Sequence, residues 1–171
     1  MFFLFYIGLP GALAERLVVD QGTSGGFETI SEAVLSANAG DEILIRPGYY
    51  REGEILVLRP ISIVGADGQA TVEAGGEAAF RVAASGCSIS GLAIRGFDKG
   101  VGVELNSPGN SIENCRISNF STGVLSASSN NWVTESEIEG CAVGVRLRDG
   151  LDDVVRDTLI RSSLGVEITG T

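Results

Sequence analysis

The stretch that decides the fold runs from residue 102 to residue 171 and reads GVELNSPGNSIENCRISNFSTGVLSASSNNWVTESEIEGCAVGVRLRDGLDDVVRDTLIRSSLGVEITGT. A glycine followed by valine recurs every 21 residues in it. Apolar residues, mostly β-branched, recur on the same period further along each unit. A period of about 20 to 25 residues with such columns is typical of a solenoid whose unit is one coil of short strands. The columns are Gly102, Gly123, Gly144 and Gly165; Ile112, Val133 and Val154; and Ile117, Ile138 and Leu159.

The alternation inside each unit predicts which side chains face inward. Val103 and Leu105 are one strand of period two with a single buried face, and the same pattern returns in later units. Ile112 starts a second short strand and Cys115–Ile117 form a third, with a bend at Asn114, a residue type that tolerates left-handed conformations. Three strands and three bends in coils of 21 residues predict an all-β fold, a right-handed parallel β-helix.

The same period, counted backwards, predicts the register of the preceding coil. It places Arg81 and Val82 opposite Gly102 and Val103. The segment from residue 87 to residue 97 is then expected to be a less regular coil.

Composition fits this fold and limits the partners. A chain of 171 residues with 44% hydrophobic content is long enough for one domain with a real core. Its net charge of −10 argues against nucleic acid and anionic membrane surfaces as partners.

The N-terminal residues 2–14, FFLFYIGLPGALA, form an apolar run that ends on small residues. This pattern is typical of a secretory signal peptide cleaved after Ala14, although no positive charge precedes the run. A buried first strand is the alternative. The run is too short to span a bilayer, so we expect no membrane insertion of the mature chain. The predicted division is a signal peptide at 1–14 and a β-helix domain at 15–171, secreted or at the cell surface.

A short helix is predicted near residues 29–38, before the regular coils. Thr29 and Glu32 have the spacing of a capping box, and Gly40 is expected to end the helix. Its apolar face would cover the open end of the solenoid, where unpaired strand edges are exposed. Strands are expected at 17–20, 42–46, 55–58 and 61–64, with turns at 47–48 and 65–68. The residues of the apolar face are Ile30, Ala33, Val34 and Ala37.

The segment from residue 25 to residue 68 resembles the N-terminal part of pectin methylesterases and related pectin-lyase-like β-helix proteins. The matching residues include a G-x-Y-x-E piece made by Gly48, Tyr50 and Glu52. The later coils, with I-x-N-x-x-I at residues 112–117 and the returning Gly-Val, resemble the repeats of NosD-like and CASH-type β-helix domains. These resemblances imply the fold, and they imply a carbohydrate esterase or polysaccharide lyase as the activity if the chain is an enzyme.

The catalytic set that the esterase resemblance implies, two Asp, an Arg and glutamines, is not complete. The only reminiscent fragment is RDTL at residues 156–159, beside the family's Q-D-T-L. The 21-residue period places Asp157 in the column of Cys115 and Ser136, which predicts an inward ladder of small polar residues. We therefore predict no catalytic residues in this chain.

Nor do the charged residues predict a metal site. Asp152 and Asp153 are interpreted as solvated turn residues, and Ca²⁺ needs several clustered acidic oxygens. Outward charges alternate in sign between neighbouring coils, which predicts surface ion pairs instead. The expected pairs are Arg116–Glu137, Glu135–Arg156 and Arg146–Glu167.

The three cysteines, Cys87, Cys115 and Cys141, fall in no shared column, so we expect buried free thiols rather than stacked disulfides. NosD-like proteins are associated with copper. Without histidine, and with Met1 as the only methionine, the chain has no imidazole or usable thioether ligand, and no cofactor is predicted.

Exposed aromatic residues are the candidates for carbohydrate binding: Trp132, which the alternation points outward or into a bend, and Tyr49 and Tyr50. Two functions remain open. One is a structural or polysaccharide-interacting module without a complete catalytic set, and the other is a fragment of a pectin esterase or lyase whose catalytic coils lie elsewhere. The final strand pattern at residues 165–171 has no evident cap, which predicts continuation of the chain or self-association through that end.

Overall fold

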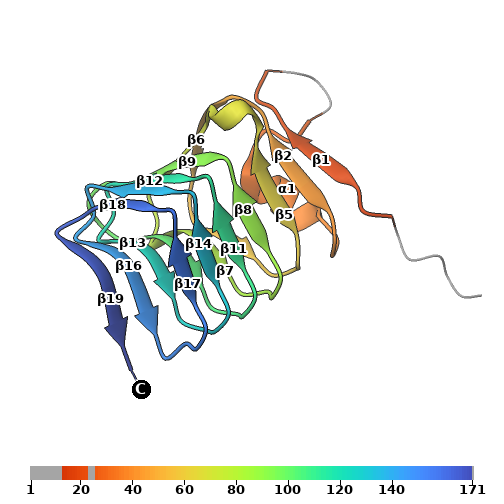
Figure 1. Cartoon of the computed structure of the whole chain (residues 1–171). Helices are drawn as coiled ribbons and strands as arrows, with labels where there is room; N and C mark the ends of the chain where they lie inside the picture. The colour runs from red at the N-terminus through yellow and green to blue at the C-terminus, as the bar shows by residue number, and fades with distance from the viewer. Residues whose placement is uncertain (1–12, 23–25, 171) are drawn as a thin grey trace, which may run out of the picture.

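The computed structural model describes residues 13–22 and 26–170 and shows a parallel β-solenoid of about seven turns. Its strands form three parallel sheets of seven, six and six strands, and each full coil contributes one strand to each sheet. Figure 1 shows the coils stacked along one axis, with helix α1 (Ile30–Ser36) at the N-terminal end. The predicted fold class is confirmed.

The three sheets are numbered in the order in which a coil visits them. Sheet 1 contains β1 (Arg16–Val19), β2 (Glu42–Ile45), β5 (Ser62–Gly65), β8 (Ser88–Ser90), β11 (Ser111–Glu113), β14 (Trp132–Thr134) and β17 (Val154–Arg156). Sheet 2 contains β3 (Gly48–Glu52), β6 (Ala70–Ala74), β9 (Leu92–Arg95), β12 (Arg116–Ser118), β15 (Glu137–Glu139) and β18 (Leu159–Arg161). Sheet 3 contains β4 (Ile55–Val57), β7 (Ala78–Val82), β10 (Val101–Leu105), β13 (Thr122–Ser126), β16 (Val143–Arg148) and β19 (Leu164–Thr169). A short 3₁₀ turn, η1 (Ala66–Gly68), joins β5 to β6.

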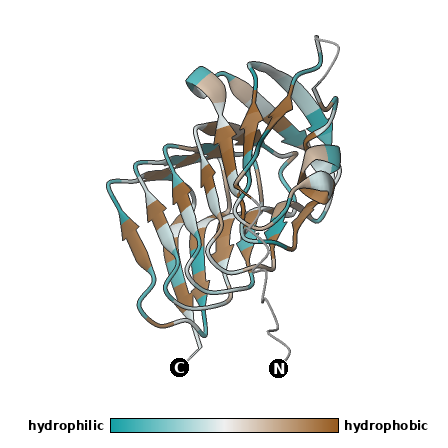
Figure 2. Ribbon diagram, turned by 90° about the vertical axis from the view of Figure 1, so that its right-hand side faces the viewer, coloured by the Kyte–Doolittle hydropathy of each residue, from teal (hydrophilic) through white to brown (hydrophobic). Residues whose placement is uncertain are grey.

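The core is built from columns of aliphatic residues, one from each sheet. Period-two alternation places every second side chain of a strand inside, and the parallel register stacks these side chains on those of the next coil. Figure 2 shows the hydrophobic segments recurring from strand to strand. Members of the three columns are Ile43, Ile63, Ile89, Ile112 and Val133; Val72, Ile94, Ile117 and Ile138; and Ile55, Phe80, Val103, Val124 and Val145, all of them buried.

The repeated glycine that precedes the valine column is required by close packing. A Cβ atom on Gly123 would lie 2.5 Å from Ile138 Cγ2 and 2.6 Å from the carbonyl oxygen of Gly144. Gly102 and Gly144 are in the same situation against the next coil. The 21-residue glycine period therefore reports where the backbone of sheet 3 passes close to the neighbouring coil and to sheet 2.

Two register predictions were wrong. In sheet 1 Val133 lies opposite Val155, not Val154, and in sheet 2 Ile138 lies opposite Ile160, not Leu159. The loop before β17 has one extra residue and the bend between β18 and β19 has one fewer, because Val145 pairs with both Val124 and Val166 on the 21-residue period.

The preceding coil also differs from its prediction. Phe80 lies opposite Val103 and Val82 opposite Leu105, so this coil is 23 residues long. It is nonetheless regular, since Ile89 of β8 pairs with Ile112 and Ile94 of β9 pairs with Ile117.

Helix α1 caps the N-terminal end as predicted. The Thr29 Oγ1 atom accepts a hydrogen bond from the Glu32 amide at 3.2 Å, and Ile30, Ala33, Val34 and Ala37 are all buried against the first coils. The predicted end of the helix was wrong. Ala37 is the C-cap, whereas Gly40, with φ of +91°, lies in the following turn and donates to the Pro60 carbonyl at 2.7 Å.

The predicted signal peptide lies almost entirely outside the described residues. Among the residues that the structure describes, no helix has the length and apolar character needed to cross a membrane.

Candidate functional site

The outer faces of sheets 2 and 3 carry charges that pair between coils. Arg116 Nε lies 3.1 Å from Glu137 Oε2, and Arg146 pairs with Glu167, as predicted. The third predicted pair, Glu135–Arg156, was wrong. The extra residue before β17 places Arg156 opposite Thr134, and the Arg156 guanidinium lies 3.6 Å from the adjacent Asp157 carboxylate.

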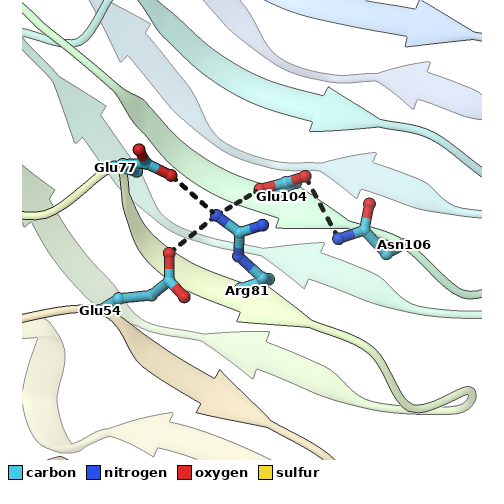
Figure 3. Close-up of polar contacts among 5 residues, drawn as sticks. All are labelled: Glu54, Glu77, Arg81, Glu104 and Asn106. Carbon is cyan, nitrogen blue, oxygen red and sulfur yellow. Dashed lines mark hydrogen bonds and ion pairs between the residues drawn. The ribbon is translucent and has the colours of Figure 1, made fainter.

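The densest charged cluster lies on sheet 3 and is centred on Arg81 of β7 (Figure 3). Its Nη2 atom lies 2.8 Å from Glu54 Oε2, 3.4 Å from Glu104 Oε2 and 3.8 Å from Glu77 Oε2. Glu104 also accepts a hydrogen bond from Asn106 Nδ2 at 3.2 Å. Register explains the cluster, because Arg81 lies directly opposite Glu104 in β10 and Leu56 in β4.

The cluster fixes the protonation state of Arg81. The hydrogen bond to Glu54, together with the charges of Glu104 and Glu77, raises the pKa of the Arg81 guanidinium further above its already high ordinary value. A guanidinium held in this way binds and orients anions but does not abstract protons at neutral pH. This arrangement is suited to joining coils rather than to acid–base chemistry.

A second cluster lies at the bend between sheets 1 and 2. Asn114, Glu135 and Asp157 share one column, and each has a positive φ, between 50° and 52°. The prediction that Asp157 belongs to an inward polar ladder was therefore wrong, because the extra residue in this coil shifts it into the bend. Thr158 occupies the ladder position, and its hydroxyl donates to the Arg156 carbonyl at 2.9 Å, as Ser136 does to the Thr134 carbonyl at 2.8 Å.

These bend residues border a shallow pocket of about 310 Å³ that Arg116 and Glu137 also line. Its carboxylates are spread over successive coils. Within residues 13–22 and 26–170, no three acidic, histidine or cysteine side chains come close enough together to hold a metal ion. The pocket contains an ion pair and exposed carboxylates but no assembled cation site.

A ladder of asparagines, which the sequence analysis missed, runs along the bend before sheet 1. Asn131 Oδ1 accepts a hydrogen bond from the Asn110 amide at 2.9 Å, and Asn110 Oδ1 accepts one from the Cys87 amide at 2.8 Å. Asp153 continues the ladder, since its Oδ1 accepts from the Asn131 amide and its Oδ2 from the Ser126 hydroxyl, both at 2.8 Å. The interpretation of Asp153 as a solvated turn residue was therefore wrong.

The three cysteines are buried free thiols in separate columns, as predicted. Burial raises the pKa of Cys115 to about 11, and burial also raises the pKa of Cys87 and Cys141. A nucleophilic cysteine needs a lowered pKa, so none of the three is a candidate nucleophile.

The structure separates the three aromatic candidates. Trp132 is 49% exposed on the outer face of sheet 1, and Tyr49 is 67% exposed on sheet 2. Tyr50 is 1% exposed, and its hydroxyl donates to the Arg46 carbonyl at 2.9 Å, so its assignment as a binding residue was wrong. Trp132 and Tyr49 lie on different faces and do not form one platform.

The outward column of Trp132 carries no charge between β5 and β17, and its charged members, Glu42 and Arg16, lie in the first coils. Ser111, Ser88 and Ser62 precede Trp132 in the same outward column, one per coil, and Val154 follows it. Ser88 Oγ lies 3.0 Å from Ser62 Oγ. We call Ser62, Ser88, Ser111 and Trp132 the serine–tryptophan row. It crosses the sheet 1 strands β5, β8, β11 and β14, which lie side by side in Figure 1.

Comparison with known proteins places this architecture in a family. The model of the family described as "Right handed beta helix region" matches residues 78–170, more than half of the chain. The chain belongs to this right-handed β-helix family. The resemblance to pectin-lyase-like proteins is thereby confirmed at the level of fold.

Two solved structures resemble this β-helix. The crystal structure of pectate lyase Pel9A matches with a TM-score of 0.68 and 16% identity, over 90% of this chain and 52% of that chain. The crystal structure of alginate lyase from Paenibacillus sp. str. FPU-7 matches with a TM-score of 0.49 and 16% identity, over 85% of this chain and 76% of that chain. No curated protein matches the sequence. The β-helix thus spans about half the length of the pectate lyase.

Proposed function

We propose that this β-helix is a secreted or cell-surface module that binds a neutral polysaccharide without cleaving it. The observation that carries the proposal is the exposed Trp132 at the end of a row of three serine hydroxyls on a parallel sheet.

The serine–tryptophan row has chemistry suited to a sugar chain. An indole face stacks on the apolar face of a pyranose ring, and serine hydroxyls donate to and accept from sugar hydroxyls. Successive rungs of a sheet are about 4.8 Å apart, close to the length of one sugar unit in an extended chain. A chain lying across the strands therefore meets one side chain of the row per sugar unit.

Charge favours a neutral ligand over a polyuronate. The chain has a net charge of −10, so its field repels an anionic polymer. The serine–tryptophan row itself contains no charged group, and Glu113 is the only acidic residue in the neighbouring outward positions of β8, β11 and β14.

The non-catalytic part of the proposal is supported by the two charged clusters. Arg81 is held protonated by three glutamates, and Asp157 points from a bend with its carboxylate next to Arg156. Neither cluster combines a group that can accept a proton with an assembled cation site, the combination that a Ca²⁺-dependent lyase mechanism requires.

The test uses Trp132 itself, because it is the only tryptophan. Titration with cellohexaose, mannohexaose and xylohexaose is expected to change its fluorescence with at least one of them, and retention on the corresponding insoluble polysaccharide is expected. Trp132→Ala should abolish retention on the polysaccharide, while Tyr49→Ala, which removes a more exposed aromatic on sheet 2, should leave retention unchanged. Equal retention of both variants, or no binding by the parent chain, would contradict the proposal.

A second function is favoured by one observation, the match of this chain to about half of a pectate lyase. In that case the coils described here are part of a polysaccharide lyase or esterase. Incubation with polygalacturonate or alginate, with and without Ca²⁺, should then yield the ultraviolet absorbance of an unsaturated product or, for an esterase, methanol from methylated pectin. Turnover that is lost in Asp157→Asn would replace the first proposal with this one.

A further inference from the structure

The buried carboxylate of Asp41 is held by two backbone amides at the start of the solenoid. Asp41 is 3% exposed, and its Oδ1 accepts from the Glu15 amide at 2.8 Å while its Oδ2 accepts from the Asn38 amide at 2.7 Å. These two bonds, that from Glu15 first, lower the pKa of the Asp41 carboxyl, so it is charged at neutral pH.

In the described part of the chain, no arginine or lysine forms an ion pair with Asp41. Buried carboxylates are normally paired, because the loss of hydration is otherwise not compensated. The group next to Asp41 Oδ1 that is able to become a cation is the nitrogen of Glu15.

The sequence before Glu15 has the features of a processing site. Ala12 and Ala14 stand at the third and first positions before Glu15, after an apolar run, and residues 13–16 are exposed. The ordered strand β1 begins one residue after Glu15, at Arg16. A cut between Ala14 and Glu15 therefore removes the apolar segment and leaves the first strand whole.

We propose that the Ala14–Glu15 bond is cleaved during export and that the ammonium group created on Glu15 forms an ion pair with Asp41. The proposal rests on the export proposed above. In the reaction, water adds to the Ala14 carbonyl carbon, the bond to the Glu15 nitrogen breaks, Ala14 leaves as a carboxylate, and the released amine takes up a proton.

The contact between Glu15 and Asp41 needs little rearrangement after cleavage. The nitrogen that now donates to Asp41 as an amide is the same atom that becomes the ammonium, and the Glu15 carbonyl stays fixed by the Glu42 amide at 2.8 Å. A hydrogen bond between two charged groups is stronger than one from a neutral amide. Cleavage at this bond, and not one residue earlier or later, places the new charge at Asp41.

The first experiment locates the processed end. The full chain is expressed in a secreting host, and the exported protein is analysed by intact mass and N-terminal sequencing. We expect Glu15 as the first residue. Export with cleavage at another bond overturns the processing site alone, whereas retention of the uncleaved chain inside the cell overturns the proposed export as well.

The second experiment tests the ion pair on purified chains with defined ends. The 15–171 chain is expected to melt roughly 2–4 °C above a 14–171 chain, the shift that a charge-assisted bond produces in a domain of this size. Acetylation of the Glu15 amine should remove the difference, and in Asp41→Asn the two lengths should melt together. Equal melting of the two unmodified chains, or a difference that survives acetylation, overturns the ion pair.

Discussion

The carboxylate of Glu52 in β3 binds the first turn of helix α1, since its Oε1 accepts a hydrogen bond from the Ile30 amide at 2.7 Å. Its Oε2 accepts from the Ser31 hydroxyl at 2.6 Å. Two residues earlier, the Tyr50 hydroxyl bonds to the Arg46 and Val19 carbonyls. The G-x-Y-x-E piece of Gly48, Tyr50 and Glu52 therefore holds the cap helix on the first coil, and its role here is architectural.

Replacing Glu52 should weaken this cap. Glu52→Ala leaves the Ile30 amide without its side-chain acceptor, so we expect a loss of about 1–2 kcal/mol in the free energy of unfolding, measured by urea titration. Glu28→Ala, which removes an exposed carboxylate just before the helix, is the control and should change stability by less than about 0.5 kcal/mol. Equal effects of the two variants would show that the bond to Ile30 is not stabilising.

The buried face of α1 provides a second test. Val34 is 5% exposed, whereas its neighbour Leu35 is 73% exposed. Val34→Asp buries an unpaired charge and should cost a few kcal/mol, on the order of 3, while Leu35→Asp should be nearly neutral. Thermal melting of both variants decides, and an unchanged melting temperature for Val34→Asp would refute the cap assignment.

Asp41 should make the free energy of unfolding depend on pH in the acidic range. Because its folded pKa is lowered, the unfolded state binds the proton first, so the contribution of Asp41 is complete above the ordinary aspartate pKa of about 3.9. This stabilising contribution is lost as the pH falls through the lowered pKa that Asp41 has in the folded state. The stability gap between the parent chain and Asp41→Asn should thus be constant near neutral pH and narrow below about pH 4. A gap that widens on acidification would contradict the assignment.

Because the three cysteines are buried, we expect their thiols to be alkylated slowly in the folded state. Cys115 is 3% exposed and its pKa is about 11, so very little thiolate is present at pH 8. Iodoacetamide should leave Cys87, Cys115 and Cys141 unmodified in native protein and label all three in guanidinium, as counted by mass spectrometry. Rapid native labelling of any of the three would show that its coil opens readily.

The sequence predicts the fold well because the repeat is a physical requirement. Glycine recurs where two backbones meet, and β-branched residues recur because each must stack on its counterpart. It predicts the last coil less well for an equally physical reason. Val154 and Val155 are both valines, and Leu159 and Ile160 are both apolar, so a shift by one residue leaves the pattern intact.

The functional residues were harder to predict. Tyr49 and Tyr50 are adjacent, and only the register of β3 against β6, which pairs Tyr50 with Val72, shows which of them faces the core. The asparagine ladder had a visible signal, because Asn110 and Asn131 stand 21 residues apart. Asp153 stands 22 residues further, because of the extra residue before β17, so the period of 21 did not reveal the charged end of the ladder.

The ladder of Asn110, Asn131 and Asp153 fixes where the sheet 1 strand begins in three successive coils. Each side-chain oxygen accepts a hydrogen bond from the backbone amide at the equivalent position of the preceding coil, immediately before a sheet 1 strand begins. The loop just before Asp153 has one additional residue, and β17 nevertheless pairs with β14 in the same parallel arrangement as the other sheet 1 strands. An insertion in one coil therefore does not shift the strands of the next coils out of register. The loops before the sheet 1 strands can differ in length from coil to coil.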